Sequence, residues 1–194
     1  MNPVGYLHNT RQGLVGDPGI GYNYILAANG LYVQAENDHL KATIPIFKLE
    51  DGRPVRGLAP LEKRVALKHG LIPAQFWYTA YDLFMQDLSS EWYVAIVWEH
   101  GRYELAQPPQ STTAASVSYE RPRNVVVDIH SHGTMKAFFS TTDDQDDQGL
   151  KVSIVVGSLD KGPAAGGHVV GRTCVYGYYA PVDGASLWGT RWSA

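Results

Sequence analysis

The chain has 194 residues, which suits one compact domain or one domain with a small appendage, and its 44% apolar and 18% charged residues are an ordinary globular balance. A formal net charge of −3 without a basic stripe excludes a protein that binds the phosphate backbone of nucleic acids. The single cysteine, Cys174, excludes an intramolecular disulfide and a cysteine-based zinc cluster, and its apolar neighbours predict that it is buried.

Neither a targeting segment nor a membrane span is recognisable in the chain. Residues 1–13 lack the apolar core of a signal peptide. The longest apolar run, residues 92–98, is far shorter than the roughly 20 residues of a membrane-spanning helix. We therefore expect a soluble, cytoplasmic protein that has no membrane partner.

The first third of the chain is predicted to be rich in β-structure. Residues 22–27 and 31–35 flank Asn29-Gly30, which tolerates the positive φ angles of a type I′ turn and so predicts a hairpin. A connection rich in proline and glycine follows at residues 51–60. We place a β-rich N-terminal subdomain at residues 1–65 and the main domain at residues 66–194.

The main domain is predicted to mix helices and strands. A helix is expected over residues 73–88, where an apolar stripe repeats at spacings of three and four: Phe76, Ala80, Leu83, Phe84 and Leu88. The run at residues 92–98 is apolar on both faces and predicts a strand buried on both sides. Further strands are expected at residues 116–119, 124–129, 152–156 and 169–179, with a glycine-rich turn at 162–167. This order predicts an α/β or α+β fold.

Two histidines follow the predicted strand at residues 124–129. Residues i and i+2 of a strand point to the same side, so His130 and His132 can reach one point in space. Neutral imidazole binds zinc well, and a catalytic zinc typically has three protein ligands and a water. By itself the pair leaves two interpretations open, a metal site or two polar groups at the end of a strand.

Ser140 and Asp143 continue the pattern after a loop of seven residues. Ser-x-x-Asp predicts a helix start in which the serine caps the first turn. The loop can turn back and bring this helix start beside the two histidines. Capping alone is the alternative explanation, and the fixed spacing from the histidines argues against it.

The combined pattern His130-x-His132-x(7)-Ser140-x-x-Asp143 resembles the signature of the JAMM metalloprotease family, also called MPN-plus or JAB, over roughly residues 66–180. The resemblance implies a mixed β-sheet with a helix on each side. It also implies that the two histidines and the aspartate bind Zn²⁺, and that Ser140 helps to stabilise the oxyanion.

The resemblance further implies a glutamate that acts as general acid and base, just after the first helix and at the start of the next strand. Glu91 occupies that place. Glu99 and Glu104 are the alternatives, although both fall near a predicted turn. An ordinary solvated residue is the other interpretation of Glu91. In the implied mechanism zinc lowers the pKa of water to about 7, and Glu91 takes its proton and later gives one to the leaving amine.

The residues around this pattern resemble one particular group of proteins within the JAMM family. Most JAMM relatives carry proline after the second histidine, whereas this chain has Gly133. The stretch His-Ser-His-Gly…Ala-Phe-Phe-Ser-x-x-Asp-Asp-x-Asp-Asp, at residues 130–147, is similar to the bacterial PRTRC system protein A family, as is Gly-Leu-Ala-Pro at residues 57–60. This resemblance implies a ubiquitin-like protein as substrate and a ThiF-related activating enzyme as a partner.

We therefore expect a zinc metallopeptidase, or isopeptidase, that cuts at the C-terminal tail of a ubiquitin-like protein. The alternative is a non-catalytic zinc-binding or scaffold module, as in relatives that have lost metal ligands. A calcium loop is rejected because Val155 stands where an EF-hand needs glutamate. Instead, Asp144, Asp146 and Asp147 are expected in a solvated first helical turn. Phe138 and Phe139 are expected to pack in the core or loop, or to form one wall of a substrate groove.

Overall fold

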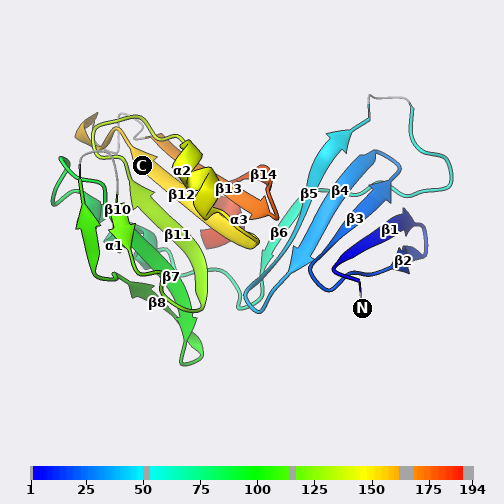
Figure 1. Cartoon of the computed structure of the whole chain (residues 1–194), viewed down its shortest axis with the longest axis horizontal. Helices are drawn as coiled ribbons and strands as arrows, with labels where there is room; N and C mark the ends of the chain where they lie inside the picture. Colours follow the sequence, from blue (N-terminus) through cyan, green and yellow to red (C-terminus); the bar gives the residue numbers. More distant parts are fainter. Residues whose placement is uncertain (1, 50–52, 114–116, 162–167, 190–194) are drawn as a thin grey trace. The chain divides into compact units, whose positions relative to one another are not determined.

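A computed structural model describes residues 2–49, 53–113, 117–161 and 168–189, and the chain falls into two compact units (Figure 1). The first unit comprises Met1–Lys68, Gln148–Leu150 and Thr173–Ala180, and the second comprises the remaining residues. The chain forms two sheets of six strands each among the described residues. The boundary between residues 65 and 66 stays a prediction.

The N-terminal sheet has the strand order β2-β1-β3-β4-β5-β6. Neighbouring strands are antiparallel except for β1 and β3, which are parallel. Leu7, Ile25, Ala27 and Tyr32 form a buried cluster against which Leu61 packs. The six strands are β1 (Val4–Thr10), β2 (Gly13–Asp17), β3 (Tyr22–Ala27), β4 (Gly30–Glu36), β5 (Leu40–Lys48) and β6 (Arg64–Leu67).

The predicted hairpin of β3 and β4 is confirmed, but its predicted type I′ turn is wrong. Ala27 pairs with Gly30, so the turn residues are Ala28 and Asn29, and neither has a positive φ. Gly30 already belongs to β4, where its φ is 148°. The Asn29 side chain accepts a hydrogen bond from the Leu61 amide and donates one to the Leu61 carbonyl, both at 2.9 Å. Asn29 therefore holds a distant segment instead of supplying a left-handed turn.

The second sheet has the strand order β14-β13-β12-β11-β7-β8, and β9 and β10 form a separate ribbon. Because β11 runs parallel to β12 and antiparallel to β7, this is a mixed sheet, as predicted. Figure 1 shows α2 in front of β12 and β13, with α1 and α3 behind the sheet. The elements are α1 (Gln75–Phe84), β7 (Tyr93–Glu99), β8 (Arg102–Ala106), β9 (Gln110–Thr112), β10 (Val117–Tyr119), β11 (Val125–Ser131), α2 (Thr141–Asp146), β12 (Leu150–Gly157), a 3-10 turn (Leu159–Lys161), β13 (His168–Val175), β14 (Tyr178–Val182) and α3 (Gly184–Trp188).

Several predictions of local structure hold for the strands of the second sheet and the helices that pack on it. The first five residues of β7 are all buried, which confirms the strand covered on both faces, and Cys174 is buried. The helix predicted at residues 73–88 is present but shorter, and its buried residues are Trp77, Ala80 and Phe84. No helix in the described part of the chain is long and apolar enough to cross a membrane.

The single strand predicted at residues 169–179 is wrong. The structure has two strands, β13 and β14, separated by a turn at Tyr176 and Gly177. Both turn residues have positive φ angles, 50° and 85°, as a type I′ turn requires. The predicted turn at residues 162–167 lies outside the described residues.

A buried network of charges joins α2 to the sheet. Asp147 follows α2 directly and is 3% exposed, so its expected place in a solvated first turn is wrong. Its carboxylate accepts from Ser153 Oγ at 2.8 Å and from Arg172 Nε at 2.7 Å. Lys151 Nζ lies 2.8 Å from the same carboxylate and also pairs with Asp128 of β11. The network thus reaches from α2 across β12 to β11 and β13.

The pKa of Asp147 reflects these contacts. Burial alone would raise it, but the charges of Lys151 and Arg172 and the hydrogen bond from Ser153 outweigh burial, and the pKa lies below its ordinary value. A carboxylate with a depressed folded pKa adds stability above its unfolded pKa of about 3.9 and loses that contribution as the pH falls through the folded value.

We predict that Asp147→Asn lowers the free energy of unfolding by about 3 kcal/mol at pH 7, because the buried Arg172 and the partly buried Lys151 lose a counter-charge. The difference between wild type and variant should shrink as the pH falls below about 4, where the Asp147 carboxyl of the unfolded chain takes up a proton before that of the folded chain does. Denaturant unfolding at pH 7 and at pH 3 measures both effects. Equal stability of the two proteins at pH 7 would contradict the assignment.

Candidate metal centre

The end of β11 directs the two histidines to the same side. Ser131, which lies between them, is fully buried on the opposite face. Its hydroxyl oxygen accepts a hydrogen bond from the Trp92 amide at 3.1 Å, and its own amide donates to the Trp92 carbonyl at 2.8 Å. Ser131 therefore holds the start of the neighbouring chain segment, where Glu91 lies, against the histidine strand.

The loop after His132 is pinned to the end of β12. The His132 amide donates to the Val156 carbonyl at 2.7 Å, and the Ser158 amide donates to the Met135 carbonyl at 2.6 Å. Gly133 has a φ of 54°, and a Cβ added there would lie 2.3 Å from the carbonyl oxygen of Leu88. This position therefore favours glycine and excludes proline, whose ring fixes φ near −65°.

Ser140 and Asp143 form a capping box at the start of α2, as the sequence predicts. The Ser140 hydroxyl oxygen accepts from the Asp143 amide at 3.2 Å, and the Ser140 amide donates to Asp143 Oδ2 at 2.6 Å. The Ser140 hydroxyl also donates to Oδ2, at 2.7 Å. Because these bonds occupy Oδ2, the other oxygen of Asp143 is directed to His130, with Oδ1 3.3 Å from Nε2.

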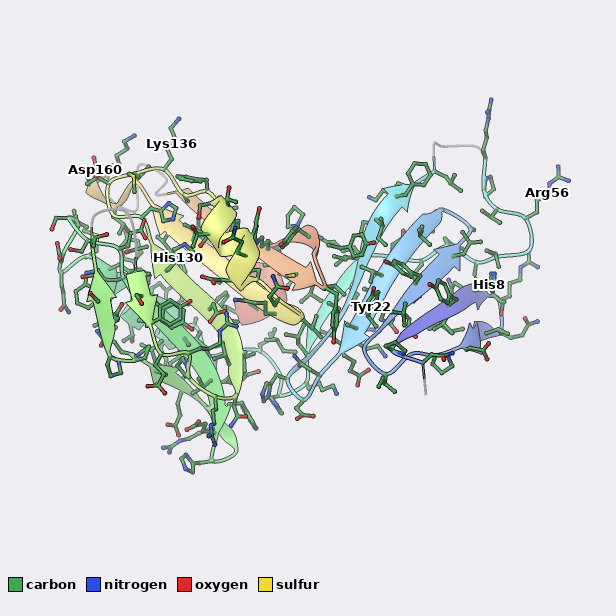
Figure 2. The ribbon with its side chains drawn as sticks, viewed as in Figure 1. His8, Tyr22, Arg56, His130, Lys136 and Asp160 are labelled. Atoms are coloured by element: carbon green, nitrogen blue, oxygen red, sulfur yellow. The ribbon has the colours of Figure 1, made fainter. Side chains whose placement is uncertain are left out.

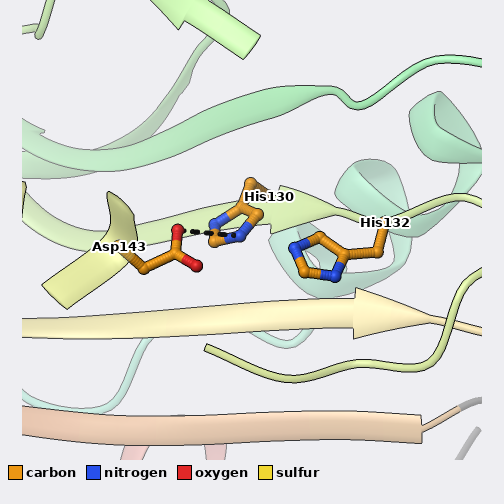
Figure 3. Close-up of side chains that lie close together, drawn as sticks. All are labelled: His130, His132 and Asp143. Atoms are coloured by element: carbon orange, nitrogen blue, oxygen red, sulfur yellow. Dashed lines mark ion pairs between the residues drawn. The ribbon is translucent and has the colours of Figure 1, made fainter. Parts of the chain in front are cut away.

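The structure brings the three predicted metal ligands together (Figure 3). One ligand atom from each of His130, His132 and Asp143 lies within 4.8 Å of the other two. Two imidazoles and one carboxylate are a donor set found in catalytic zinc sites, which keep a further position for water. The residues present therefore fit a zinc ion.

A backbone contact orients His132 for this role. Its Nδ1 lies 3.3 Å from the carbonyl oxygen of Lys136, an acceptor, so Nδ1 carries the proton and Nε2 keeps its lone pair. The Lys136 side chain itself is exposed and points away from the sheet (Figure 2). Burial lowers the pKa of His132 and, although Asp143 opposes it, also that of His130. Both rings are consequently neutral at pH 7, as metal ligands must be.

Glu91 lies in the same cavity, which has a volume of about 240 Å³. It is 8% exposed, and its Oε1 is 4.0 Å from His132 Nε2. Burial is the main cause that raises the pKa of Glu91 to about 7, and the negative charge of Asp143 is the second. Of the alternatives, Glu99 ends β7 and Glu104 lies in β8, and both line a different cavity.

Sequence reasoning missed most of the apolar wall of the cavity. Val117 and Tyr119 of β10 line it together with Met135, and Tyr119 stacks on Tyr93 with ring centroids 3.5 Å apart. No local pattern points to these residues, because the β9–β10 ribbon meets the site only in the folded chain. Phe138, predicted as a core residue or a groove wall, also lines the cavity and is 49% exposed.

Comparison with known proteins gives one family. Residues 78–169 match the family model for prokaryotic homologs of the JAB domain. The matched segment contains the three candidate ligands as well as Glu91 and Ser140. Among curated proteins, none matches the chain.

We predict that Gly133→Ala destabilises the protein more than Gly101→Ala does. Both glycines have positive φ, 54° and 75°, and the left-handed conformation costs alanine about 1–2 kcal/mol at either position. Gly101 has open space around it, whereas Gly133 meets the Leu88 carbonyl. Denaturant unfolding of the two variants isolates the additional cost of that contact. An equal loss of stability in both would show that the loop adapts to the new methyl group.

Proposed function

We propose, from the match of residues 78–169 to the family model for prokaryotic homologs of the JAB domain, that the chain is a zinc-dependent peptidase acting on the C-terminal tail of a ubiquitin-like protein. One observation carries the proposal. A single cavity of about 240 Å³ holds the ligand atoms of His130, His132 and Asp143 together with Glu91, a carboxyl group whose pKa is raised to about 7.

In the proposed site His130, His132 and Asp143 hold Zn²⁺. When bound, zinc supplies Lewis acidity, which lowers the pKa of water to about 7 and polarises a carbonyl group. Two features of the protein favour binding of the ion. Both imidazoles are neutral, and the capping box directs one oxygen of Asp143 to His130.

Glu91 is suited to move protons in both directions. With a pKa of about 7 it is partly ionised and partly protonated at neutral pH, so it can accept a proton from water and deliver one to the leaving amine. Its low exposure keeps bulk water from competing for that proton. Ser140 has two tasks in the proposal: its hydroxyl orients Asp143, and it must leave that bond before it can donate to an oxyanion.

The proposed substrate is an extended tail at the end of a ubiquitin-like protein. Two features support it. Met135 and Phe138, which line the cavity with the apolar residues of β10, are 39% and 49% exposed, so an unfolded segment can reach the ligands. In addition, residues 130–147 resemble the PRTRC system protein A family, which implies a ubiquitin-like substrate and a ThiF-related activating enzyme as a partner.

We predict that the purified protein binds about one Zn²⁺ per chain. His130→Ala and Asp143→Ala should each lose most of the bound metal, because a donor atom of the site is removed. Elemental analysis of the purified proteins, together with titration of zinc into metal-free protein, measures this. A wild-type chain with no affinity for zinc would refute the metal site.

We predict that Glu91→Gln keeps the zinc but slows cleavage by about 10²–10⁴-fold, the usual contribution of a general acid or base. The substrates are ubiquitin-like proteins with extended tails, incubated with and without a chelator and analysed by mass. Glu99→Gln is the matched control, since Glu99 lines a different cavity.

Normal cleavage by the Glu91→Gln variant would show that another group is the base. A wild-type protein that binds zinc and leaves every extended tail intact would instead support the non-catalytic zinc-binding or scaffold module.

A further inference from the structure

Helix α2 carries the third metal ligand but has no apolar attachment to the sheet. Its six residues, Thr-Thr-Asp-Asp-Gln-Asp, include no buried side chain. A helix of this length is not stable by itself in water, where roughly 12–15 residues are needed even for favourable sequences. The position of Asp143 over the sheet must therefore come from polar contacts at the ends of α2.

Arg172 supplies contacts at both ends. From β13, its Nε donates to Asp147 Oδ2 at 2.7 Å, directly after α2, and its Nη1 lies 2.5 Å from Asp144 Oδ1 in the first turn. The guanidinium carbon also lies 3.9 Å from the centre of the Phe139 ring, one residue before the capping serine. A single side chain, 10% exposed, thus holds the residues before, within and after the helix.

Arg172 makes these contacts at a distance from the ligands. It belongs to β13, which is separated from the histidine strand β11 by β12. Lys151 of β12 adds a second connection, because it bridges Asp147 to Asp128, a residue of β11 two positions before His130. Displacement of α2 would move Asp143 Oδ1 away from His130 while leaving the two histidines in place.

We propose that Arg172 is a positioning residue for the metal site: by clamping Asp144 and Asp147 it fixes α2 so that Asp143 completes the ligand set. The inference rests on the proposed zinc site and adds that the affinity of this site depends on a residue that does not touch the metal. Arginine suits the task because its planar fork can bind two carboxylates at once, whereas lysine is a single point charge.

The test compares zinc affinities, measured by competition with a chromophoric chelator, in two backgrounds. In the otherwise wild-type chain, Arg172→Met should weaken zinc binding by about 10- to 100-fold, the range usual for residues that orient metal ligands. Arg172→Lys should recover part of this loss. In the Asp143→Ala background, Arg172→Met should change the affinity little, because the residue through which Arg172 acts is already gone.

Lys41→Met is the matched control. That lysine also pairs with a carboxylate, Glu36, but it is 48% exposed and belongs to β5 of the N-terminal sheet, so zinc affinity should not change. If Arg172→Met does not fold, Asp144→Asn removes one arm of the clamp and should weaken zinc binding in the same direction but less.

Two results would overturn the positioning role: unchanged zinc affinity in folded Arg172→Met, or an equal loss of affinity with and without Asp143. Either can occur while the wild-type protein still binds zinc through His130, His132 and Asp143, so the positioning role can fail while the proposed metal site stands. Conversely, a wild-type chain that binds no zinc would refute the metal site itself.

Discussion

The buried carboxylate of Asp147 holds the site together. Lys151 and Ser153 of β12 and Arg172 of β13 surround it, and Lys151 also pairs with Asp128 of β11, so a short polar helix is bound to three strands of the sheet. Burying charges is costly unless they are paired and hydrogen-bonded, so this network tolerates few arrangements. That restriction matters because the helix has no apolar face of its own. The ion pairs of Asp147 thereby fix the position of α2, and with it the position of the Asp143 carboxylate oxygen that is directed to His130.

Burial shapes the chemistry of the cavity in two opposite ways. It disfavours charge on every group, so the pKa values of His130 and His132 fall while that of Glu91 rises to about 7. The histidines are thus neutral, as a metal requires, and Glu91 can hold or release a proton near neutral pH. One physical cause prepares both the ligands and the proposed proton carrier.

Much of the fold and the site could be predicted because the signals are local. The alternation of a strand places His130 and His132 on one side, and Ser-x-x-Asp marks the helix start at Ser140. The predictions of local structure were wrong where a residue adopts a role that its neighbours in the sequence do not indicate. Asn29 holds Leu61 instead of forming a type I′ turn, and the residues around Tyr176 turn instead of continuing a strand.

The sequence by itself determined the mixed fold, the residue types of the candidate ligand set and their spacing, since these follow from backbone periodicity and a family pattern. The tertiary structure decided what periodicity cannot encode. It separated Glu91, which lines the cavity of the candidate ligands, from Glu99 at the end of β7 and Glu104 in β8, which line a different cavity. It also brought Asp147 out of a supposed solvated turn into a buried network with Arg172. Partners 25 residues apart meet only when strands pair, so no local pattern could identify them.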